Sequence, residues 1–515
     1  MSDLIKKEAT LESGTYVDRE AGSVQNTSAR VTWFEQFKEL GRCRRTVAAA
    51  FACSSGAVLI GYDMTFIGSI IANEEFIKQF GLYDTNISTW ILPANYQLVW
   101  SVVQYVAAMV GAFGIGLLSD RFGRRVCFYV TVSLTIAGTF VELFSPNWEV
   151  WVVAKVLMGA AMGFMQGNTP TYVSELTPVH IRGFMLSLFQ FWIMLGSFLA
   201  ACVLEGTSLV NGTWSWKGAI VSQFGLGAIC LALFLPLVPE SPYYLVRRGR
   251  SDAAREALLA LHGKDTPEYT VESDLEMIQN TIEQEQEANQ NQASYLQCLK
   301  GVNRRRTLIA CLPMVMQMFA GYPLCGTYLA YFLTLSGISN SFLITVISIL
   351  FAVLAVAVAF IMIEKVGRRP QLLFGAFAML PCLLGISILG FVNLGTIANG
   401  RGLAALSILW TICYFLSIGA VGWTIVGEVS SVQLRAKTTS IAAAINSLFN
   451  MGWSIAIPYL INKNEANLGP KAGLIFLGTG TFFAFIAFFA IPETKNKTWA
   501  ELDQLFEAHT PARKF

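Results

Sequence analysis

Long apolar runs separated by short polar stretches dominate this chain. A run of about 20 apolar residues is long enough to cross the ~30 Å hydrocarbon core of a bilayer as a helix. Runs of this length start near residues 47, 93, 126, 150, 185, 218, 307, 342, 371, 403, 438 and 472. The pattern predicts an all-α membrane protein with twelve transmembrane helices.

One longer polar stretch, which includes "TIEQEQEANQNQ", separates the first six runs from the last six. Its composition is typical of a solvated linker with short helices. The chain therefore divides into two six-helix halves. We expect an N-terminal tail over 1–46, an N-terminal half over 47–246, the linker over 247–306, a C-terminal half over 307–491 and a C-terminal tail over 492–515.

The charge distribution also points to lipid and gives the protein an orientation. Only 14% of the residues are charged, against roughly 25% in soluble domains. Arginines gather at connections on the same side as the N-terminus, as at Arg42, at 121–125 and at 304–306. By the positive-inside rule, both termini are then cytoplasmic. Two glycosylation triplets, at Asn86 and Asn211, fall in the outer loops.

Three motifs recur in the two halves. "GLLSDRFGRR" at 116–125 returns as "EKVGRR" at 364–369, and "PESP" at 239–242 returns as "PETK" at 492–495. "SEL" and "GEV" each contain a glutamate that an arginine follows seven residues later. Two six-helix halves of equal orientation are the plan of secondary transporters, whose substrate site lies between the halves near the midplane.

The charged residues of these motifs lie at the inner ends of the predicted helices. Because arginine and carboxylate can pair bidentately, such pairs could latch the inner faces of the halves in one state and break in the other. Alternatively, the arginines only fix the topology and the acids are their helix-end partners. The candidate latch residues are Asp120, Arg121, Arg124, Arg125, Glu175, Arg182, Glu240, Glu364, Arg368, Arg369, Glu428, Arg435 and Glu493.

One acid, Asp63, lies inside the first apolar run, within "LIGYDMTFIGS". A charge near the middle of a membrane helix costs ~2.5 to 3.5 kcal/mol, so an acid here indicates a function. The first helix reaches Asp63 in the outer half of the membrane, and Lys155 comes only a few residues after the outer end of the fourth helix. The two side chains are therefore expected at similar depth.

The chain resembles the sugar porter family of the major facilitator superfamily from about residue 50 to 508. The resemblance rests on "GYD" at 61–63, "GLLSDRFGRR", "YVSEL", "PESP" and "PETKNKTWAELDQLF". "WTIVGEVSSVQLRAK" at 423–437 resembles the fungal alpha-glucoside permease branch. This implies a proton-coupled carrier of a fungal plasma membrane, in which Asp63 and Lys155 form the proton-coupling pair. A static ion pair is the alternative.

The resemblance also implies a binding site for a polyol. Amides offer both donors and acceptors to hydroxyl groups, and an indole face packs on a sugar ring. Met318, Pro323 and Ala420 replace residues that the family uses, which makes a less polar or bulkier substrate than a hexose plausible. Each amide could instead make only an interhelical hydrogen bond. The expected substrate-binding residues are Gln190, Gln317, Trp423, Asn446 and Asn450.

The leading hypothesis is therefore a proton-coupled importer of a sugar, either an alpha-glucoside such as maltose or a hexose. The main alternative is a carrier of the same fold for a non-sugar molecule, such as a quinate-like acid or a fungal secondary metabolite. A nutrient sensor is a minor alternative. An enzyme is not expected, because the three histidines lie outside the apolar runs. We expect no cofactor, metal, nucleic acid or obligate protein partner; the partners are the bilayer, protons and a small-molecule substrate.

Overall fold

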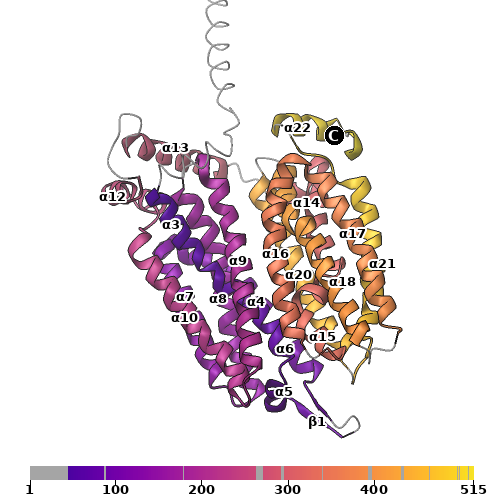
Figure 1. Cartoon of the computed structure of the whole chain (residues 1–515). Coiled ribbons are helices and arrows are strands. Elements are labelled where there is room, and N and C mark those ends of the chain that lie inside the picture. The colour runs from indigo at the N-terminus through magenta and orange to yellow at the C-terminus, as the bar shows by residue number, and fades with distance from the viewer. Residues whose placement is uncertain are drawn as a thin grey trace, which may run out of the picture.

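The structure is a computed structural model that describes residues 44–515 except 86–88, 178, 263–270, 291–294, 339, 393–396, 431–433, 463, 496, 498 and 509. Two bundles of long helices stand side by side, one from each half of the chain (Figure 1). Within the described residues, eleven helices are long and apolar enough to cross a membrane. A twelfth span is interrupted, as described below. Each span begins within six residues of its predicted start.

The N-terminal bundle begins with a span made of two helices that meet at Gly56. The next long helices follow one another with short connections, and Asn147 caps α8 by accepting a hydrogen bond from the backbone N–H of Val150. The helices of this bundle are α3 (Arg44–Ser55), α4 (Ala57–Ile70), α6 (Ala94–Phe122), α7 (Arg124–Leu143), α8 (Trp148–Leu176), α9 (Val179–Ser208) and α10 (Trp214–Leu237).

The C-terminal bundle repeats this arrangement with more interruptions. Its tenth span is also made of two helices, which meet at Ser417. The helices after the interrupted seventh span are α16 (Ser341–Lys365), α17 (Arg368–Leu389), α18 (Ile397–Leu416), α19 (Ile418–Val429), α20 (Arg435–Ile461), the 3₁₀ turn η4 (Gly469–Ala472) and α21 (Gly473–Ala490).

The seventh span is not the single helix that the apolar run predicts. It consists of α14 (Gly301–Phe319), a π-helical turn η2 (Pro323–Thr327) and α15 (Leu329–Leu335). Gly321 has φ +105°, which ends α14, and Pro323 has no backbone N–H to continue its hydrogen bonding. Irregular backbone at membrane depth is tolerated where protein surrounds it, and Leu324 is fully buried.

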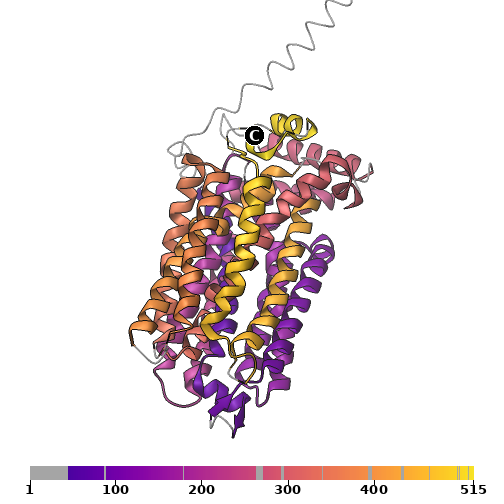
Figure 2. The same ribbon diagram turned by 90° about the vertical axis from the view of Figure 1, so that its right-hand side faces the viewer.

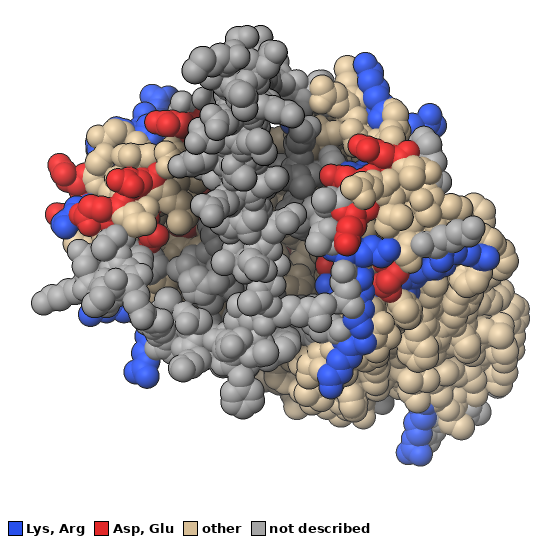
Figure 3. Space-filling view, turned by 90° about the horizontal axis from the view of Figure 1, so that it is seen from above, with Lys and Arg blue, Asp and Glu red and all other residues tan. Residues whose placement is uncertain are grey.

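The linker and the C-terminal segment cover one end of the bundles, which we call the linker side (Figures 1 and 2). α14 begins at Gly301, so the three arginines at 304–306, which we expected at the end of the linker, lie in its first turns. The elements on this side are α11 (Pro242–Arg247), α12 (Ser251–His262), α13 (Val271–Gln290), η1 (Tyr295–Leu299), α22 (Trp499–Glu507) and η5 (Ala512–Lys514). Seen from this side, charged side chains gather on both flanks (Figure 3).

The opposite end, which we call the hairpin side, carries α5 (Glu74–Phe80) and an antiparallel hairpin of β1 (Leu82–Asp84) and β2 (Thr89–Ile91). Asn73 caps α5 by accepting from two backbone N–H groups. Phe76 and Phe80 pack their rings against three tryptophans of the N-terminal bundle, with ring centroids 5.1 to 6.3 Å apart. This aromatic layer covers the bundle on the hairpin side.

The two bundles meet mainly in the part nearer the hairpin side. A Cβ added to Gly68 would lie 2.0 Å from the carbonyl oxygen of Thr327, so only glycine allows α4 to approach η2 this closely. Gln97 of α6 donates a hydrogen bond to the hydroxyl of Tyr331 of α15 at 3.4 Å. Closer to the middle, Trp192 and its neighbours on α9 pack near Val353 of α16. These contacts close the hairpin side between the halves.

Candidate functional site

Three ionisable side chains form a buried cluster in the N-terminal bundle. The Nζ of Lys155 on α8 lies 2.6 Å from Oε1 of Glu142 on α7 and 3.9 Å from Oδ1 of Asp63 on α4. The side chains of Lys155, Glu142 and Asp63 are only 1%, 0% and 5% exposed. Asp63 and Lys155 thus lie side by side as the depth argument predicted, but the closer partner of the lysine is Glu142.

Aromatic rings and one amide complete the surroundings of this cluster. The ammonium group of Lys155 lies 5.1 Å from the ring centroid of Trp151 and 5.6 Å from that of Phe66, within the range of cation–π attraction. Gln104 of α6 donates a hydrogen bond to Oδ2 of Asp63 at 2.7 Å. The remaining oxygens, Asp63 Oδ1 and Glu142 Oε2, are buried without a hydrogen-bond partner among the described residues.

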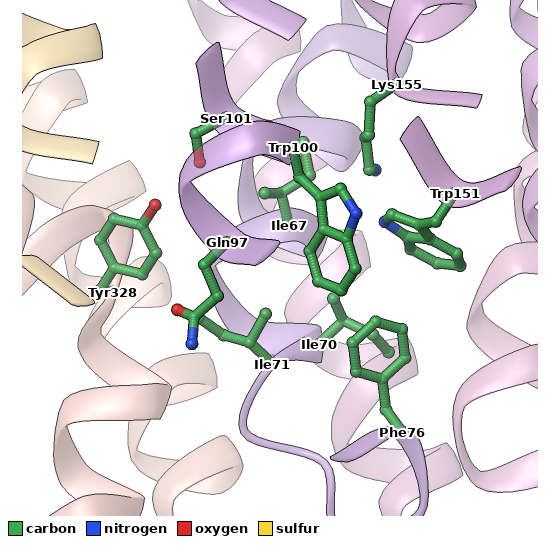
Figure 4. Close-up of a pocket in the computed structure, with 10 residues that line it drawn as sticks. All are labelled: Ile67, Ile70, Ile71, Phe76, Gln97, Trp100, Ser101, Trp151, Lys155 and Tyr328. Atoms are coloured by element: carbon green, nitrogen blue, oxygen red, sulfur yellow. The ribbon is translucent and has the colours of Figure 1, made fainter. Parts of the chain in front are cut away.

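A small cavity lies beside Lys155 (Figure 4). Its volume of about 10 Å³ is close to the space that one water molecule needs. Trp100 and Gln97 line it from α6, and Tyr328 lines it from the C-terminal bundle. The cavity therefore touches the charge cluster through Lys155 and the C-terminal bundle through Tyr328.

Two of the predicted substrate-binding amides contact each other in the C-terminal bundle. Asn446 of α20 donates a hydrogen bond to Oε1 of Gln317 on α14 at 3.3 Å, and Gln317 donates to the carbonyl oxygen of Ile418 at 3.3 Å. Gln317 is buried, while Asn446 is half-buried. The amide pair joins the seventh, tenth and eleventh spans at the break between α18 and α19.

Asn450, one turn further along α20, faces the other bundle. Its Oδ1 accepts a hydrogen bond from the hydroxyl of Tyr105 on α6 at 3.0 Å. Tyr105 directly follows Gln104, the residue that holds Asp63. Two neighbouring residues of α6 thus link the charge cluster of one half to a predicted substrate residue of the other.

The remaining two predicted substrate residues stand apart from these contacts. Gln190 is half-buried on α9 of the N-terminal bundle, and the side chain of Trp423 on α19 is 42% exposed. Among the described residues, no hydrogen bond joins Gln190 to the amides of the C-terminal bundle. Of the five predicted residues, the structure therefore brings Gln317 and Asn446 into contact.

The repeated motifs build two matching clusters on the linker side, one in each half. In the N-terminal half, Arg124 reaches Glu175 at 3.1 Å and Asp120 at 3.4 Å. Glu240 accepts hydrogen bonds from the backbone N–H groups of Arg124 and Arg125 at the start of α7, where a carboxylate is favoured by the helix dipole. These contacts join α6, α7, α8 and the segment after α10.

The C-terminal half repeats this geometry. Arg368 lies 2.9 Å from Glu428, and Glu493 accepts from the backbone N–H groups of Arg368 and Arg369. The glycine before each helix, Gly123 or Gly367, has φ +96° or +108°. A Cβ there would lie 2.5 Å or 2.7 Å from the capping glutamate, so the turn excludes other residues.

Several other predicted latch residues play different structural parts. Arg125 and Arg369 donate to the carbonyl oxygens of Leu235 and Phe488, in the last helix of their own half. Arg121 is exposed. The side chains of Arg182, Glu364 and Arg435 lie outside the described part of the chain. The ion pairs described in these two clusters each join helices of one half, so here they hold each bundle together and do not bridge the two bundles.

Glu142 and Gln104 were not among the site residues predicted from the sequence. Glu142 lies near the end of the third apolar run, where an acid costs less than at the middle of a span but still stands out from its apolar neighbours. That signal was present in the sequence. Gln104 carried no comparable signal, because a single amide in a span is common. Of the glycosylation triplets, Asn211 is exposed next to the start of α10, and Asn86 lies outside the described residues.

The chain is similar to known fungal transporters. The family described as "Sugar (and other) transporter" matches residues 48–506. The general alpha-glucoside permease of Saccharomyces cerevisiae is 28% identical over 90% of this chain and 75% of its own length. The maltose permease MAL61 of the same yeast is 28% identical over 91% and 77%, and the major facilitator-type transporter ecdD of Aspergillus rugulosus is 28% identical over 89% and 86%.

Solved structures of the xylose transporter XylE from E. coli share the fold. Its inward open conformation aligns with a TM-score of 0.71 at 22% identity, covering 88% of this chain and 98% of that one. Its partially occluded inward open conformation aligns with a TM-score of 0.70 at 22% identity, covering 88% and 100%.

Two six-helix bundles with repeated linker-side clusters and a charge cluster inside one of them define a multi-pass membrane transporter of the major facilitator fold. The relatives above are permeases and transporters. Within this class, the chain belongs to the family of sugar and other transporters.

Proposed function

We propose that this protein imports a sugar together with a proton by alternating access, and that the sugar is an alpha-glucoside such as maltose. We further propose that it resides in the plasma membrane with the linker side and both termini in the cytoplasm. The arginines at 121–125 and 304–306 support this orientation through the positive-inside rule. The names of the yeast permeases at 28% identity support the substrate class.

The observation that carries proton coupling is the buried contact between Lys155 and two acids. Two carboxylates cannot both stay charged at no cost in a membrane-embedded bundle with one lysine between them. A carboxyl group that takes up and releases a proton during each cycle removes this imbalance. Asp63 has the looser contact with Lys155, at 3.9 Å, and is therefore the residue that we expect to carry the proton.

The link between proton and substrate runs through α6. Gln104 donates to Asp63, and the next residue, Tyr105, donates to Asn450 across the interface between the halves. A substrate hydroxyl that takes over the oxygen of Asn450 would free Tyr105 and so act on the helix that holds Asp63. We propose that the sugar site is completed by Gln190, Gln317, Trp423 and Asn446. The amides would act as donors and acceptors for hydroxyl groups, and the indole would pack on the sugar ring.

A second candidate is a carrier of the same fold for a non-sugar small molecule, such as a quinate-like acid or a fungal secondary metabolite. It is favoured by Met318, which is buried next to Gln317 on α14. Unlike an amide, its thioether donates no hydrogen bond. The amides of Gln317 and Asn446 also satisfy each other in part. Of the two kinds of molecule, a fungal secondary metabolite is the less polar substrate, whereas a quinate-like acid carries several hydroxyl groups and a carboxylate.

Uptake measurements separate these candidates. Yeast cells that lack their own sugar transporters would express the protein and receive labelled maltose, glucose or quinate at two external pH values. We expect maltose to accumulate faster at the lower pH and a protonophore to abolish the accumulation. Accumulation of quinate alone would favour the second candidate.

The variant Asp63→Asn tests the coupling in the same cells. We expect it to lose acid-stimulated accumulation and to retain exchange of labelled for unlabelled maltose down a gradient, because exchange needs no net proton movement. Accumulation by Asp63→Asn at the normal rate and with the normal pH dependence would contradict the assigned role of Asp63.

A further inference from the structure

Glu142 gives the charge cluster one negative charge more than Lys155 can balance. Its Oε1 lies 2.6 Å from the ammonium group, and its side chain is fully buried near the hairpin end of α7. The acid–lysine pair of α4 and α8 would be neutral without it. With it, the three groups are neutral only when one carboxyl group is protonated, and a buried net charge is costly.

We propose that Glu142 makes a bound proton obligatory for the cluster. Because Glu142 pairs with Lys155, the negative charge of Asp63 is left unbalanced. The buried cluster must therefore carry one proton whenever it is closed to water. This rests on the proposed proton coupling and deepens it. Glu142 acts as a positioning residue, because it holds the lysine and need not contact the substrate.

The geometry supports this division of roles. The lysine lies 1.3 Å closer to Glu142 than to Asp63, as the two distances of 2.6 and 3.9 Å show. Oδ2 of Asp63 accepts a hydrogen bond from Gln104, while Oδ1 is buried with no hydrogen-bond partner among the described residues. Oδ1 of Asp63 is the oxygen that faces the lysine, at 3.9 Å and without a hydrogen bond to any described residue, so the charge of Asp63 is compensated less well than that of Glu142.

The cavity beside Lys155 offers a place for water next to the cluster: Lys155 lines it, and Asp63 lies 3.9 Å beyond the lysine. It has space for about one water molecule and lies between the cluster and the hairpin side. When the hairpin side opens, water in this cavity would deliver a proton to the carboxylate of Asp63. When the linker side opens and water reaches the cluster, the same carboxyl group would return the proton to water and become a carboxylate again.

The other titratable groups near the cluster leave this charge count unchanged. Tyr62 of α4 donates to the carbonyl oxygen of Ala219, Tyr105 of α6 donates to Asn450, and Tyr328 lines the cavity from the C-terminal half. All three are phenols, which carry no charge at neutral pH. The net charge of the cluster therefore depends on Asp63, Glu142 and Lys155.

Infrared spectroscopy of the purified full chain tests the proposal without any substrate. The C=O stretch of a protonated carboxyl group is distinct from that of a carboxylate, and isotope exchange in D₂O marks it. We expect the wild-type protein to show one buried protonated carboxyl group at neutral pH. Glu142→Gln should lack it, because Asp63 and Lys155 alone are neutral as an ion pair. The matched control is Glu149→Gln, since Glu149 is exposed at the start of α8; it should keep the band.

Transport of labelled maltose in proteoliposomes gives the second readout. Glu142→Gln should still exchange maltose, but its proton-driven accumulation ratio should fall at least roughly tenfold. A second acid restored on the other side of Asp63, in Glu142→Gln combined with Gln104→Glu, should recover the infrared band and the accumulation. This rescue variant also keeps the test decisive if Glu142→Gln alone folds poorly.

The outcomes separate this inference from the proposed function. If the wild-type protein accumulates maltose with protons and Glu142→Gln does so equally well, the inference is overturned while the proposed function stands. If maltose is not transported but the infrared band disappears in Glu142→Gln and remains in Glu149→Gln, the substrate assignment fails and the charge inference stands. A wild-type protein without the band, or a band that Glu142→Gln retains, overturns the inference.

Discussion

The linker-side clusters occur in both halves of this transporter, but among the residues that the structure describes the charge cluster near the hairpin side occurs in only one. Arg124 with Glu175 and Glu240 has its counterpart in Arg368 with Glu428 and Glu493. By contrast, the spans of the C-terminal half have no charged residue in their central parts and present amides such as Gln317 and Asn446 there. The repeat is thus preserved where it holds helices together and lost where the two halves do different chemistry.

The largest effect is expected from removing the lysine of the unrepeated cluster. Lys155→Met leaves Asp63 and Glu142 without a buried cation, and breaking a buried ion pair in this way costs ~3–5 kcal/mol. We expect a large drop in the thermal unfolding temperature in detergent. Lys217→Met, on a half-buried lysine of α10, is the matched control and should change little.

A triple variant sharpens this prediction. Lys155→Met combined with Asp63→Asn and Glu142→Gln has no charge left to bury, so it should recover much of the lost stability while remaining uncoupled. A single Lys155→Met that unfolds at the wild-type temperature would mean that the cluster does not depend on its charges.

The repeated clusters should respond alike in the two halves, with a smaller effect. Arg124→Ala and Arg368→Ala each remove hydrogen bonds to a carboxylate, which are worth ~1.5–3 kcal/mol. Arg124→Ala should cost more, since its side chain is 5% exposed against 12% for Arg368. Both should slow maltose exchange far more than they change its affinity, because the clusters lie far from the amides. Lost affinity with a normal exchange rate would contradict this.

The substrate site should respond through affinity. Gln190→Ala and Asn450→Ala should weaken maltose binding about five- to a hundredfold, because each leaves a substrate hydroxyl unpaired at a cost of ~1–3 kcal/mol. Binding would be measured by competition in the exchange assay. Tyr105→Phe is the control for Asn450, because it removes the hydroxyl that donates to Asn450 and leaves the amide of Asn450 in place. Equal effects of Tyr105→Phe and Asn450→Ala would indicate that Asn450 acts only in that bond.

The smallest effect is expected from an ion pair outside the membrane. Arg255 of α12 lies 3.0 Å from Glu272 of α13, and both side chains are well exposed. The hydrogen bond from Arg255 lowers the pKa of Glu272, so any stabilisation is present at neutral pH and is lost as the pH falls through that lowered pKa. Arg255→Ala should leave the unfolding temperature unchanged within error at neutral pH. A shift as large as that of Lys155→Met would remove the contrast between the regions.

The fold could be predicted almost completely from the sequence, and the site only in part. Apolar runs of the right length give all twelve spans, since the bilayer fixes the length of a helix that crosses it. The break in the seventh span was not predicted, because the composition of an apolar run is the same for a continuous helix and for an interrupted one. An interrupted backbone is tolerated only where protein covers it, and the apolar run does not show this. Gly321 and Pro323 were the local signals.

Within the site, the positions of Asp63 and Lys155 along their helices were enough to predict that the two side chains lie at similar depth. They could not give the rotation of α7, which turns Glu142 toward the lysine, because helix rotation depends on packing with several neighbours at once. The same limit applies to Gln104 and Tyr105, which face opposite halves although they are adjacent in the chain.

The capping glutamates also bear on how the chain is assembled as it is made. Glu240 follows the last helix of the first half, 116 residues after its partner Arg124, so the start of α7 gains its carboxylate only when the sixth span has been synthesised. At that point α14 has not yet emerged. The helices of the first half can therefore pack together before the second half is synthesised. In the same way, the start of α17 gains the carboxylate of Glu493 only after the last span of the second half has been made.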